Sequence, residues 1–207
     1  MTQPPAAARP RHERPPLPPR ERMLRAAVRL ISMQGVTATG LREIAAAAGA
    51  PRGSLQHYFP GGKDQLVAEA LAIAGEVAAR RVRRYAARRP APTPGDLFAA
   101  IAGAWRDSYA SRGYAEGCPL AATATDAAAA SPVLRDALRH ALDTWLDSLA
   151  GALATLGVPA SRTRPLALLM FAALEGALIL ARSREDTQPL DAVIAELRPV
   201  LDAARAG

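Results

Sequence analysis

The chain has 207 residues, half of them apolar, and its 26 Lys and Arg exceed its 19 Asp and Glu by a formal net charge of +7. A single cysteine excludes a disulfide framework and a Cys-based zinc site, and it makes a reducing compartment the default. The apolar share argues against wholesale disorder. Alanine dominates that share while aromatic and β-branched residues are scarce, which indicates helices rather than strands.

The positive charge is concentrated near the N-terminus. Residues 1–63 contain ten Lys and Arg against three Glu, whereas residues 64–207 contain sixteen of each sign. An excess placed in this way attracts a polyanion such as nucleic acid. The alternative is a solvated basic surface, and charge alone does not decide between the two.

The first segment is rich in proline and arginine. Seven prolines in the first 19 residues predict a disordered arm over residues 1–19, and this arm lacks the apolar stretch of a secretory signal. The longest apolar window, residues 165–181, contains Glu175 and falls short of the roughly 20 residues needed to span a bilayer. We therefore expect a cytoplasmic protein without a membrane segment, in which this window is a buried helix.

Folding should begin near Arg20. A first helix that ends at Gly35 is predicted from apolar residues repeating at spacings of three and four: Met23, Leu24, Ala27, Leu30 and Ile31. A short helix over residues 41–48 follows, with Glu43 in the position of a capping-box acid and Thr39 as an alternative cap.

A third short helix is predicted from Pro51, where a first helical residue tolerates proline, to Tyr58, and a long helix from Lys63 toward Arg89. No window alternates with period two over a useful length, so we expect no sheet. Apolar spacing and Pro or Gly punctuation predict five further helices, which bring the total to about nine: residues 96–111, 120–130, 133–156, 165–183 and 189–204.

Residues 39–59 have the spacing of a helix-turn-helix. Two short helices that cross steeply need a small residue at the crossing and a turn residue that accepts positive φ, and Ala45 and Gly49 provide these. Ile44 and Leu55 are placed to pack the two helices together. In an alanine-rich chain this spacing alone is weak evidence.

The second of these helices is polar. It would present Arg52, Ser54, Gln56, His57 and Tyr58 on the element that enters the major groove. The alternatives are a solvent-facing imidazole for His57 and a partly buried core ring for Tyr58. Lys63 begins the next helix, where its ammonium and the free backbone N–H groups suit a phosphate.

The sequence from Arg22 to Leu66 includes MLRAAVRLISMQG and then LREIAAAAGAPRGSLQHYFPGGKDQL, and it resembles the N-terminal domain of TetR/AcrR-type transcriptional regulators. In that family the segment Arg-Gly-Ser-Leu-x-x-Tyr-Phe forms the recognition helix, and the Tyr and Lys contact phosphates. Gly40 and Pro51 depart from the usual Ser or Thr, which leaves the phosphate contact near position 40 to other side chains. The DNA-binding residues that we expect are Thr39, Arg42, Arg52, Gly53, Ser54, Gln56, His57, Tyr58 and Lys63.

The resemblance implies an all-α homodimer with a three-helix helix-turn-helix domain over residues 17–77, whose motif spans about 40–59. A long helix would join it to a ligand-binding and dimerisation bundle over residues 78–207. Dimerisation would use helices 165–183 and 189–204. The Phe-Pro-Gly-Gly-Lys joint and the later Gly117-Cys118-Pro119-Leu120 resemble the LmrA/YxaF-type subgroup, which is associated with responses to drug-like compounds.

Rare large side chains in an alanine-rich bundle suggest a cavity, although ordinary core packing is the alternative for each of them. Glu175 stands out because an acid within an apolar helix needs a donor, a cationic ligand or a partner subunit. Cys118 is expected to be a small buried hydrophobe, with thiol sensing as the alternative. The pocket residues that we expect are Trp105, Tyr109, Cys118, Trp145, Met170, Phe171 and Glu175.

These features predict a ligand-responsive DNA-binding regulator, a repressor that leaves a palindromic operator on binding a small, largely apolar molecule. We expect no catalysis, cofactor or metal site, because His12, His57 and His140 lie apart and no nucleophile motif or metal-ligand spacing is near them. The alternative is a basic helical protein that binds nucleic acid without sequence preference.

Overall fold

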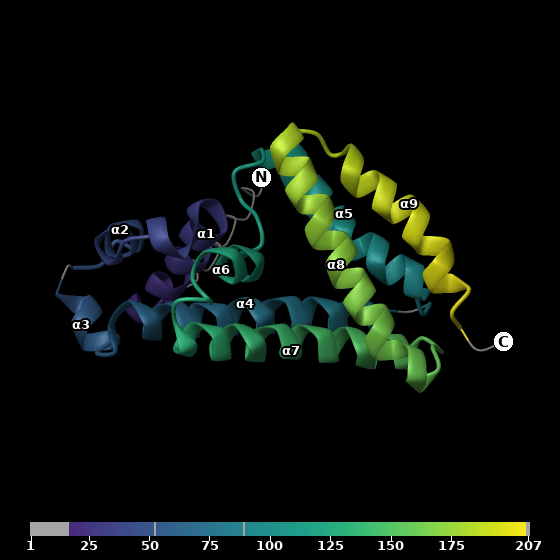
Figure 1. Ribbon diagram of the computed structural model, residues 1–207, viewed down its shortest axis with the longest axis horizontal. Helices are drawn as coiled ribbons and strands as arrows, with labels where there is room; N and C mark the ends of the chain where they lie inside the picture. The colour runs from purple at the N-terminus through teal and green to yellow at the C-terminus, as the bar shows by residue number, and fades with distance from the viewer. Residues whose placement is uncertain (1–16, 52, 89, 206–207) are drawn as a thin grey trace, which may run out of the picture.

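The computed structural model describes residues 17–51, 53–88 and 90–205, so most of the predicted arm, and Arg52, lie outside the described residues. In this part of the chain the predicted all-helical fold is confirmed, with nine helices and no strands (Figure 1). In chain order they are α1 Pro19–Ala38, α2 Leu41–Ala47, α3 Ser54–Tyr58, α4 Gly62–Ala86, α5 Pro94–Arg112, α6 Pro119–Asp126, α7 Pro132–Thr155, α8 Ala160–Arg184 and α9 Gln188–Asp202.

Two long helices, α4 and α7, lie side by side along the length of the molecule (Figure 1). Helices α1, α2 and α3 gather at one end of this pair, and α5, α8 and α9 form an inclined group toward the other. Helix α6 packs on α1, α4 and α7 between the two groups. The arrangement places the predicted DNA-binding motif at one tip and the predicted pocket in the opposite half.

Helix α4 belongs to both halves. Its first turns bury Leu66 and Leu71 in the core that α1 shares, and its later turns bury Ala79 and Val82. At a rise of 1.5 Å per residue its 25 residues span about 37 Å. A displacement in the regulatory half can therefore reach the DNA-binding tip through one continuous helix.

Several helix boundaries differ from the expectation. Helix α1 continues to Ala38, beyond a non-helical residue at Gly35 where it was predicted to end. Helix α3 begins at Ser54 rather than at Pro51, which is not helical, and it is only five residues long. Helix α4 ends at Ala86, and α6 ends at Asp126 instead of continuing to residue 130. At the ends of α4 and α6 an alanine-rich or polar run continued the helical pattern past the point where the chain leaves the helix.

Helix α8 begins at Ala160 and carries Pro165 inside it, whereas the sequence suggested a start at the proline. Proline removes only the N–H that would bond to the carbonyl of Ser161, in an exposed opening turn where water can replace it. The helix is therefore 25 residues long, which by length and composition is enough to cross a membrane. The expectation that this segment is too short was wrong, and its packing on α7 and α9 is the better evidence of its role.

Candidate nucleic-acid interface and effector pocket

Helices α2 and α3 form the predicted helix-turn-helix. Ile44 and Ala45 of α2 and Leu55 of α3 are buried, and Gly49 in the turn has φ +58°, which glycine adopts without strain. Arg22 of α1 holds the turn: its Nε donates to the carbonyl of Ala48 at 2.8 Å, and its Nη2 donates to that of Gly49 at 3.3 Å. This role of Arg22 was not predicted, because no local pattern in the sequence marks an arginine that bonds to a carbonyl 26 residues away.

The start of α2 is capped with Glu43 in its predicted place and not by the alternative, Thr39. Gly40 is the N-cap, and the Glu43 carboxylate accepts its N–H at 3.5 Å, as expected of a capping-box acid. Thr39 is fully buried, and its hydroxyl donates to the carbonyl of Gly35 at 2.6 Å. The side chain of Thr39 therefore neither caps α2 nor faces outward toward a phosphate.

The remaining described residues of the expected DNA-binding set surround α3. Arg42, Gly53, Gln56 and His57 are exposed, whereas Ser54, Tyr58 and Lys63 are half-buried. Tyr58 packs against the core and meets the edge of the His57 ring, with the centroids 5.0 Å apart. The Lys63 ammonium donates to the Thr37 carbonyl at 3.4 Å. Arg52 lies outside the described residues.

Much of the N-terminal positive charge has partners inside the molecule. Arg20 pairs with Glu69, Arg25 with Glu21 and Arg29 with Glu116, while Arg22 bonds to backbone carbonyls. These pairs are exposed and contribute little to stability. They do reduce the positive charge of α1 that is available to nucleic acid, so the described basic residues best placed near α3 are Arg42 and Lys63.

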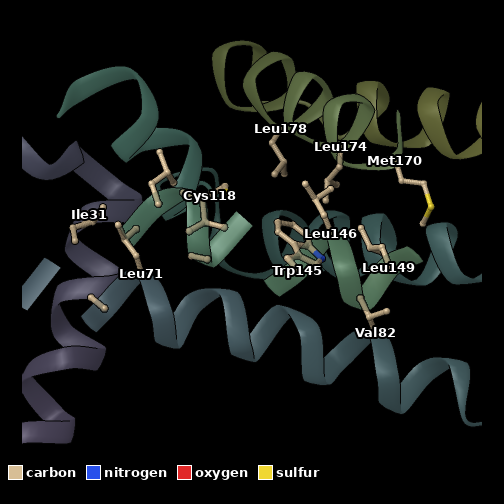
Figure 2. Close-up of a cluster of buried hydrophobic side chains, with 14 of the residues drawn as sticks. Ile31, Leu71, Val82, Cys118, Trp145, Leu146, Leu149, Met170, Leu174 and Leu178 are labelled. Atoms are coloured by element: carbon tan, nitrogen blue, oxygen red, sulfur yellow. The ribbon is translucent and has the colours of Figure 1, made fainter. Parts of the chain in front are cut away.

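The expected pocket residues fall into two neighbouring groups. The first is apolar: Trp145, Met170 and Phe171 line a cavity of about 10 Å³ between α7, α8 and α5, together with Phe98, Ile101, Leu149 and Leu174. Trp145 meets Phe171 edge-on, with the centroids 5.1 Å apart. Figure 2 shows Trp145 and Leu149 of α7 beneath Met170, Leu174 and Leu178 of α8. This space holds about one water molecule.

The second group is polar and lies where α5, the start of α6 and α8 meet. The Cys118 thiol is within hydrogen-bonding reach of the Glu175 carboxylate, and Tyr109 is close enough to feel its charge. Burial raises the pKa of Glu175 to about 7 and that of Tyr109 to about 12. Burial also raises the pKa of the Cys118 thiol well above its usual value, so the thiol stays protonated and unreactive. Trp105 lies beside this group, with the centroid of its ring 6.0 Å from that of Tyr109.

Three buried side-chain polar atoms among the described residues have no hydrogen-bond partner: Tyr109 Oη, Trp145 Nε1 and Glu175 Oε1. All three belong to residues that the sequence nominated for the pocket. The described residues contain no group of three or more His, Cys, Asp or Glu side chains that could hold a metal ion.

Comparison with known proteins identifies the fold and the family. A model of the tetR family of bacterial regulatory proteins matches residues 23–70, and a model of the C-terminal domain of LmrA/YxaF-like transcriptional regulators matches residues 94–196. An uncharacterised HTH-type transcriptional regulator of Mycobacterium tuberculosis is 38% identical, with 88% of this chain and 94% of that protein covered. The HTH-type transcriptional regulator LmrA of Bacillus subtilis is 30% identical, with 83% and 90% covered.

The chain belongs to the TetR family of transcriptional regulators, in the LmrA/YxaF-like subgroup. A TetR regulator of Legionella pneumophila has the same fold, with a TM-score of 0.80 at 21% identity over 91% of this chain and all of that one. The matched families consist of transcriptional regulators, in agreement with the expectation that the chain is not an enzyme.

In this TetR-family chain one arginine joins the two halves. Arg182 of α8 donates to the carbonyls of Tyr114 at 3.2 Å and Ala115 at 3.1 Å, in the connection before α6, and to the carbonyl of Met33 in α1 at 3.3 Å. A Cβ on Gly117 would lie 2.6 Å from Arg182 Nη1, so the side chain passes only because this residue is glycine. Sequence analysis assigned no role to Arg182.

Helix α6 is tied to the DNA-binding domain at both ends. Before it, the N–H of Gly117 donates to the carbonyl of Ser32 in α1 at 2.8 Å. At its other end the Asp126 carboxylate accepts the N–H of Thr37 at 2.7 Å, and hydrogen bonds from Thr37 lower its pKa. Cys118, the residue before α6, is close enough to Glu175 to affect its pKa, so the polar group adjoins the start of α6.

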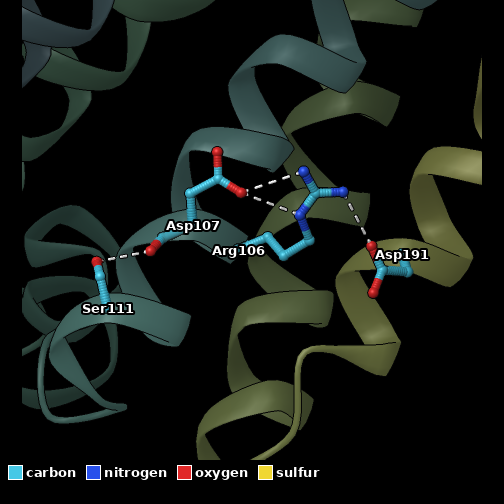
Figure 3. A network of polar contacts seen from close by, with 4 residues as sticks. All are labelled: Arg106, Asp107, Ser111 and Asp191. Carbon is cyan, nitrogen blue, oxygen red and sulfur yellow. Dashed lines mark hydrogen bonds and ion pairs between the residues drawn. The ribbon is translucent and has the colours of Figure 1, made fainter.

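Helices α5 and α9 are clamped together by ion pairs. The Arg106 guanidinium lies between Asp107, at 3.1 Å, and Asp191 of α9, at 3.2 Å, while Ser111 Oγ donates to the Asp107 carbonyl at 2.7 Å (Figure 3). At the other end of the pair Arg198 bonds to Asp96. These pairs are exposed, so the packing of α9 on α5, rather than the pairs, sets the surface that α8 and α9 present outward.

That outward surface is apolar. On α8 it consists of Leu168, Ala172, Gly176, Ile179 and Leu180, with Ile179 63% exposed. Between Pro165 and Arg182 no charged residue of α8 faces solvent. The exposed residues of α9 are Gln188, Ala192, Ala195, Glu196, Pro199 and Val200, together with Asp191 and Arg198, which pair with α5.

Proposed function

We propose that the protein is a repressor that binds a palindromic operator as a homodimer and leaves it when a small, largely apolar effector enters the regulatory half. The observation that carries this proposal is the helix-turn-helix core, on which α3 holds Gln56 and His57 exposed and α2 holds Arg42 exposed. Polar side chains on a short helix fixed by buried apolar residues suit base edges in a major groove.

Contacts with DNA divide into two kinds. Base edges would be contacted by Gln56 and His57, and by Arg52, four residues before Gln56 in the sequence. Tyr58 and Lys63 would contact phosphates, which position the protein without carrying sequence information. The inward-facing Thr39 is left out of this set, and Arg42 takes the phosphate contact near Gly40.

The second copy would cover the outward faces of α8 and α9. An exposed apolar stripe of this length is unusual on a monomer, and Ala172 and Gly176 at its centre allow two helices to approach closely. Covering the stripe by protein also accounts for a helix as apolar as α8 without a membrane. We accordingly place the protein in the cytoplasm with its DNA.

Release from DNA would follow from a change in the separation of the two recognition helices. Half-sites lie one helical turn apart, about 34–36 Å, so a shift of a few ångströms weakens simultaneous binding of both. The contacts of Arg182, Gly117 and Asp126 with α1 offer the path by which the regulatory half would impose this shift.

The rival function, nucleic-acid binding without sequence preference, would depend on the basic arm rather than on α1, because all four arginines of α1 have partners within the molecule. The deciding experiment recovers the genomic DNA fragments that the purified protein retains and compares their affinity with that of random DNA. A repressor should prefer its operator by about 10³-fold or more. A ratio near one would establish the rival.

A further inference from the structure

The three unpartnered polar atoms all lie in the regulatory half, on three different helices. Tyr109 Oη comes from α5, Trp145 Nε1 from α7 and Glu175 Oε1 from α8, and the three residues are 2%, 6% and 9% exposed. Buried polar atoms normally have partners, because burial without one costs the free energy of desolvation. Three such atoms from three different helices indicate a site whose partner is not another side chain among the described residues.

Apolar and polar surfaces meet along one side of α8. Phe171 and Glu175 are four residues apart, so they lie one above the other on the helix, and Leu174 between them lines the apolar cavity. Trp145 belongs to both surfaces, since its ring lines the cavity while its N–H lacks an acceptor. A molecule with an apolar body and one polar end fits this order.

The charges around Glu175 determine which kind of polar group the ligand should have. The groups that face it are the Tyr109 hydroxyl from α5 and the Cys118 thiol from the start of α6. Arg182 lies seven residues, or about two turns, further along α8. Its guanidinium is engaged by backbone carbonyls, and its charge counteracts the rise in the pKa of Tyr109. The charged residues of α7 and α9 nearest to α8 and α5 are paired elsewhere, Asp143 and Asp147 with Arg164, and Asp191 with Arg106. No described basic side chain forms an ion pair with Glu175.

We propose that Glu175, with Tyr109 beside it, binds a protonated amine of the effector, whose apolar body lies between α7 and α8 against Trp145 and Phe171. The proposal deepens the effector site of the proposed function and rests on it. An ammonium group supplies both the donors and the opposite charge that the buried carboxylate lacks. An anionic effector would meet an uncompensated carboxylate, and a neutral one would supply no charge.

Protonation gives the proposal a distinct signature. The pKa of Glu175 lies near 7 in the empty site, so below that pH the carboxyl must release a proton before it can pair with a cation. The ionised fraction rises roughly tenfold between pH 6 and pH 8, and affinity for an amine should rise by the same factor. A neutral ligand would not show this rise.

The test uses naphthylalkyl amines of increasing chain length, each matched with the alcohol and the carboxylate of the same skeleton. Binding to the full-length protein is followed by calorimetry and by quenching of tryptophan fluorescence. We expect at least one amine to bind ten times more tightly than its alcohol and carboxylate, with the pH dependence described above. In Glu175→Gln the preference and the pH dependence should disappear.

A matched control is Glu185→Gln at the exposed C-terminal end of α8, which should behave as the unaltered protein. Thermal melting verifies that both variants fold. If no amine is preferred over its matched alcohol, or if Glu175→Gln keeps the preference, the inference is overturned. Operator binding of the unaltered protein is measured separately, so a failure of the proposed function appears as loss of the preference for operator over random DNA, whatever the amines do.

Discussion

The DNA-facing surface around α3 and the polar group around Glu175 are both built from polar side chains, but their surroundings are opposite. Gln56 and His57 are exposed, so water satisfies them until DNA displaces it. Tyr109, Trp145 and Glu175 are buried, and their unpartnered atoms lower the stability of the fold. The comparison implies that substitutions at the first site change binding alone, whereas those at the second change binding and stability in opposite directions.

The largest effect should come from the two faces of α8. Leu178 is 2% exposed in the core, and Leu178→Arg should destabilise the fold by about 4 kcal/mol or more, because it buries an unpaired charge. Ile179→Arg on the outward face should leave each subunit folded but produce monomers that bind operator at least tenfold more weakly. Circular dichroism and sedimentation distinguish the two results.

A control for the outward face is Val133→Arg, since Val133 is also exposed, at 54%, but lies at the start of α7. This variant should remain dimeric. A dimeric Ile179→Arg with normal operator affinity would show that the second copy binds elsewhere.

The next effect concerns stability and pH. The pKa of Glu175 is raised from 4.5 to about 7, so the folded protein holds this proton more tightly than the unfolded chain. The stabilisation from the proton is complete below pH 4.5 and is lost as the pH rises through 7, a loss of about 3 kcal/mol. Glu175→Gln should remove this dependence and be more stable than the unaltered protein at pH 8.

Urea unfolding at pH 5 and pH 8, at one protein concentration, measures that difference. An equal loss of stability in the unaltered protein and in Glu175→Gln would mean that the Glu175 carboxylate is solvated or paired when ionised. The Glu175 group would then not differ from the surface around α3 in the way described.

At the exposed end, Gln56→Ala should weaken operator binding by about 1–3 kcal/mol and leave the unfolding free energy nearly unchanged. Lys63→Ala should instead weaken operator and random DNA to a similar degree and lower the salt slope by about one unit, because a phosphate contact is not sequence-specific. Gel shifts on both DNAs at two salt concentrations compare the variants. Equal losses on both DNAs for Gln56→Ala would remove α3 from base recognition.

The smallest effect is expected at the connection between the two regions. Arg182→Met keeps much of the side-chain volume but removes the donors to Tyr114, Ala115 and Met33. Operator affinity without effector should change little, while the weakening of that affinity by a bound amine should fall by about 1–2 kcal/mol. Titrating operator at zero and saturating amine gives the coupling directly. Undiminished coupling would locate the path outside Arg182.

Features that depend on residues close together in the sequence could be predicted, and features that depend on tertiary contacts could not. The helix-turn-helix depends on neighbours within twenty residues, so the spacing of Ile44, Gly49 and Leu55 was enough to locate it. Thr39 was misjudged because its partner, the Gly35 carbonyl, depends on how α1 ends. An acidic residue within an apolar helix was enough to predict that Glu175 needs a partner, and Glu175 is buried with one oxygen unpartnered. Arg22 and Arg182 escaped because their partners are backbone carbonyls brought together only by the fold.

The small volume between α7 and α8 also limits the rate at which an effector can bind. A space of about 10 Å³ admits one water, whereas pockets for drug-sized ligands measure roughly 300 Å³ or more. An effector that contacts Trp145 and Phe171 can therefore bind only when α7 and α8 separate. As the effector concentration increases, the association rate should reach a plateau at the rate of that opening. Because apparent affinity scales with the fraction of molecules already open, loosening the contact of Trp145 with Phe171 should make the regulator respond both sooner and at lower effector concentration.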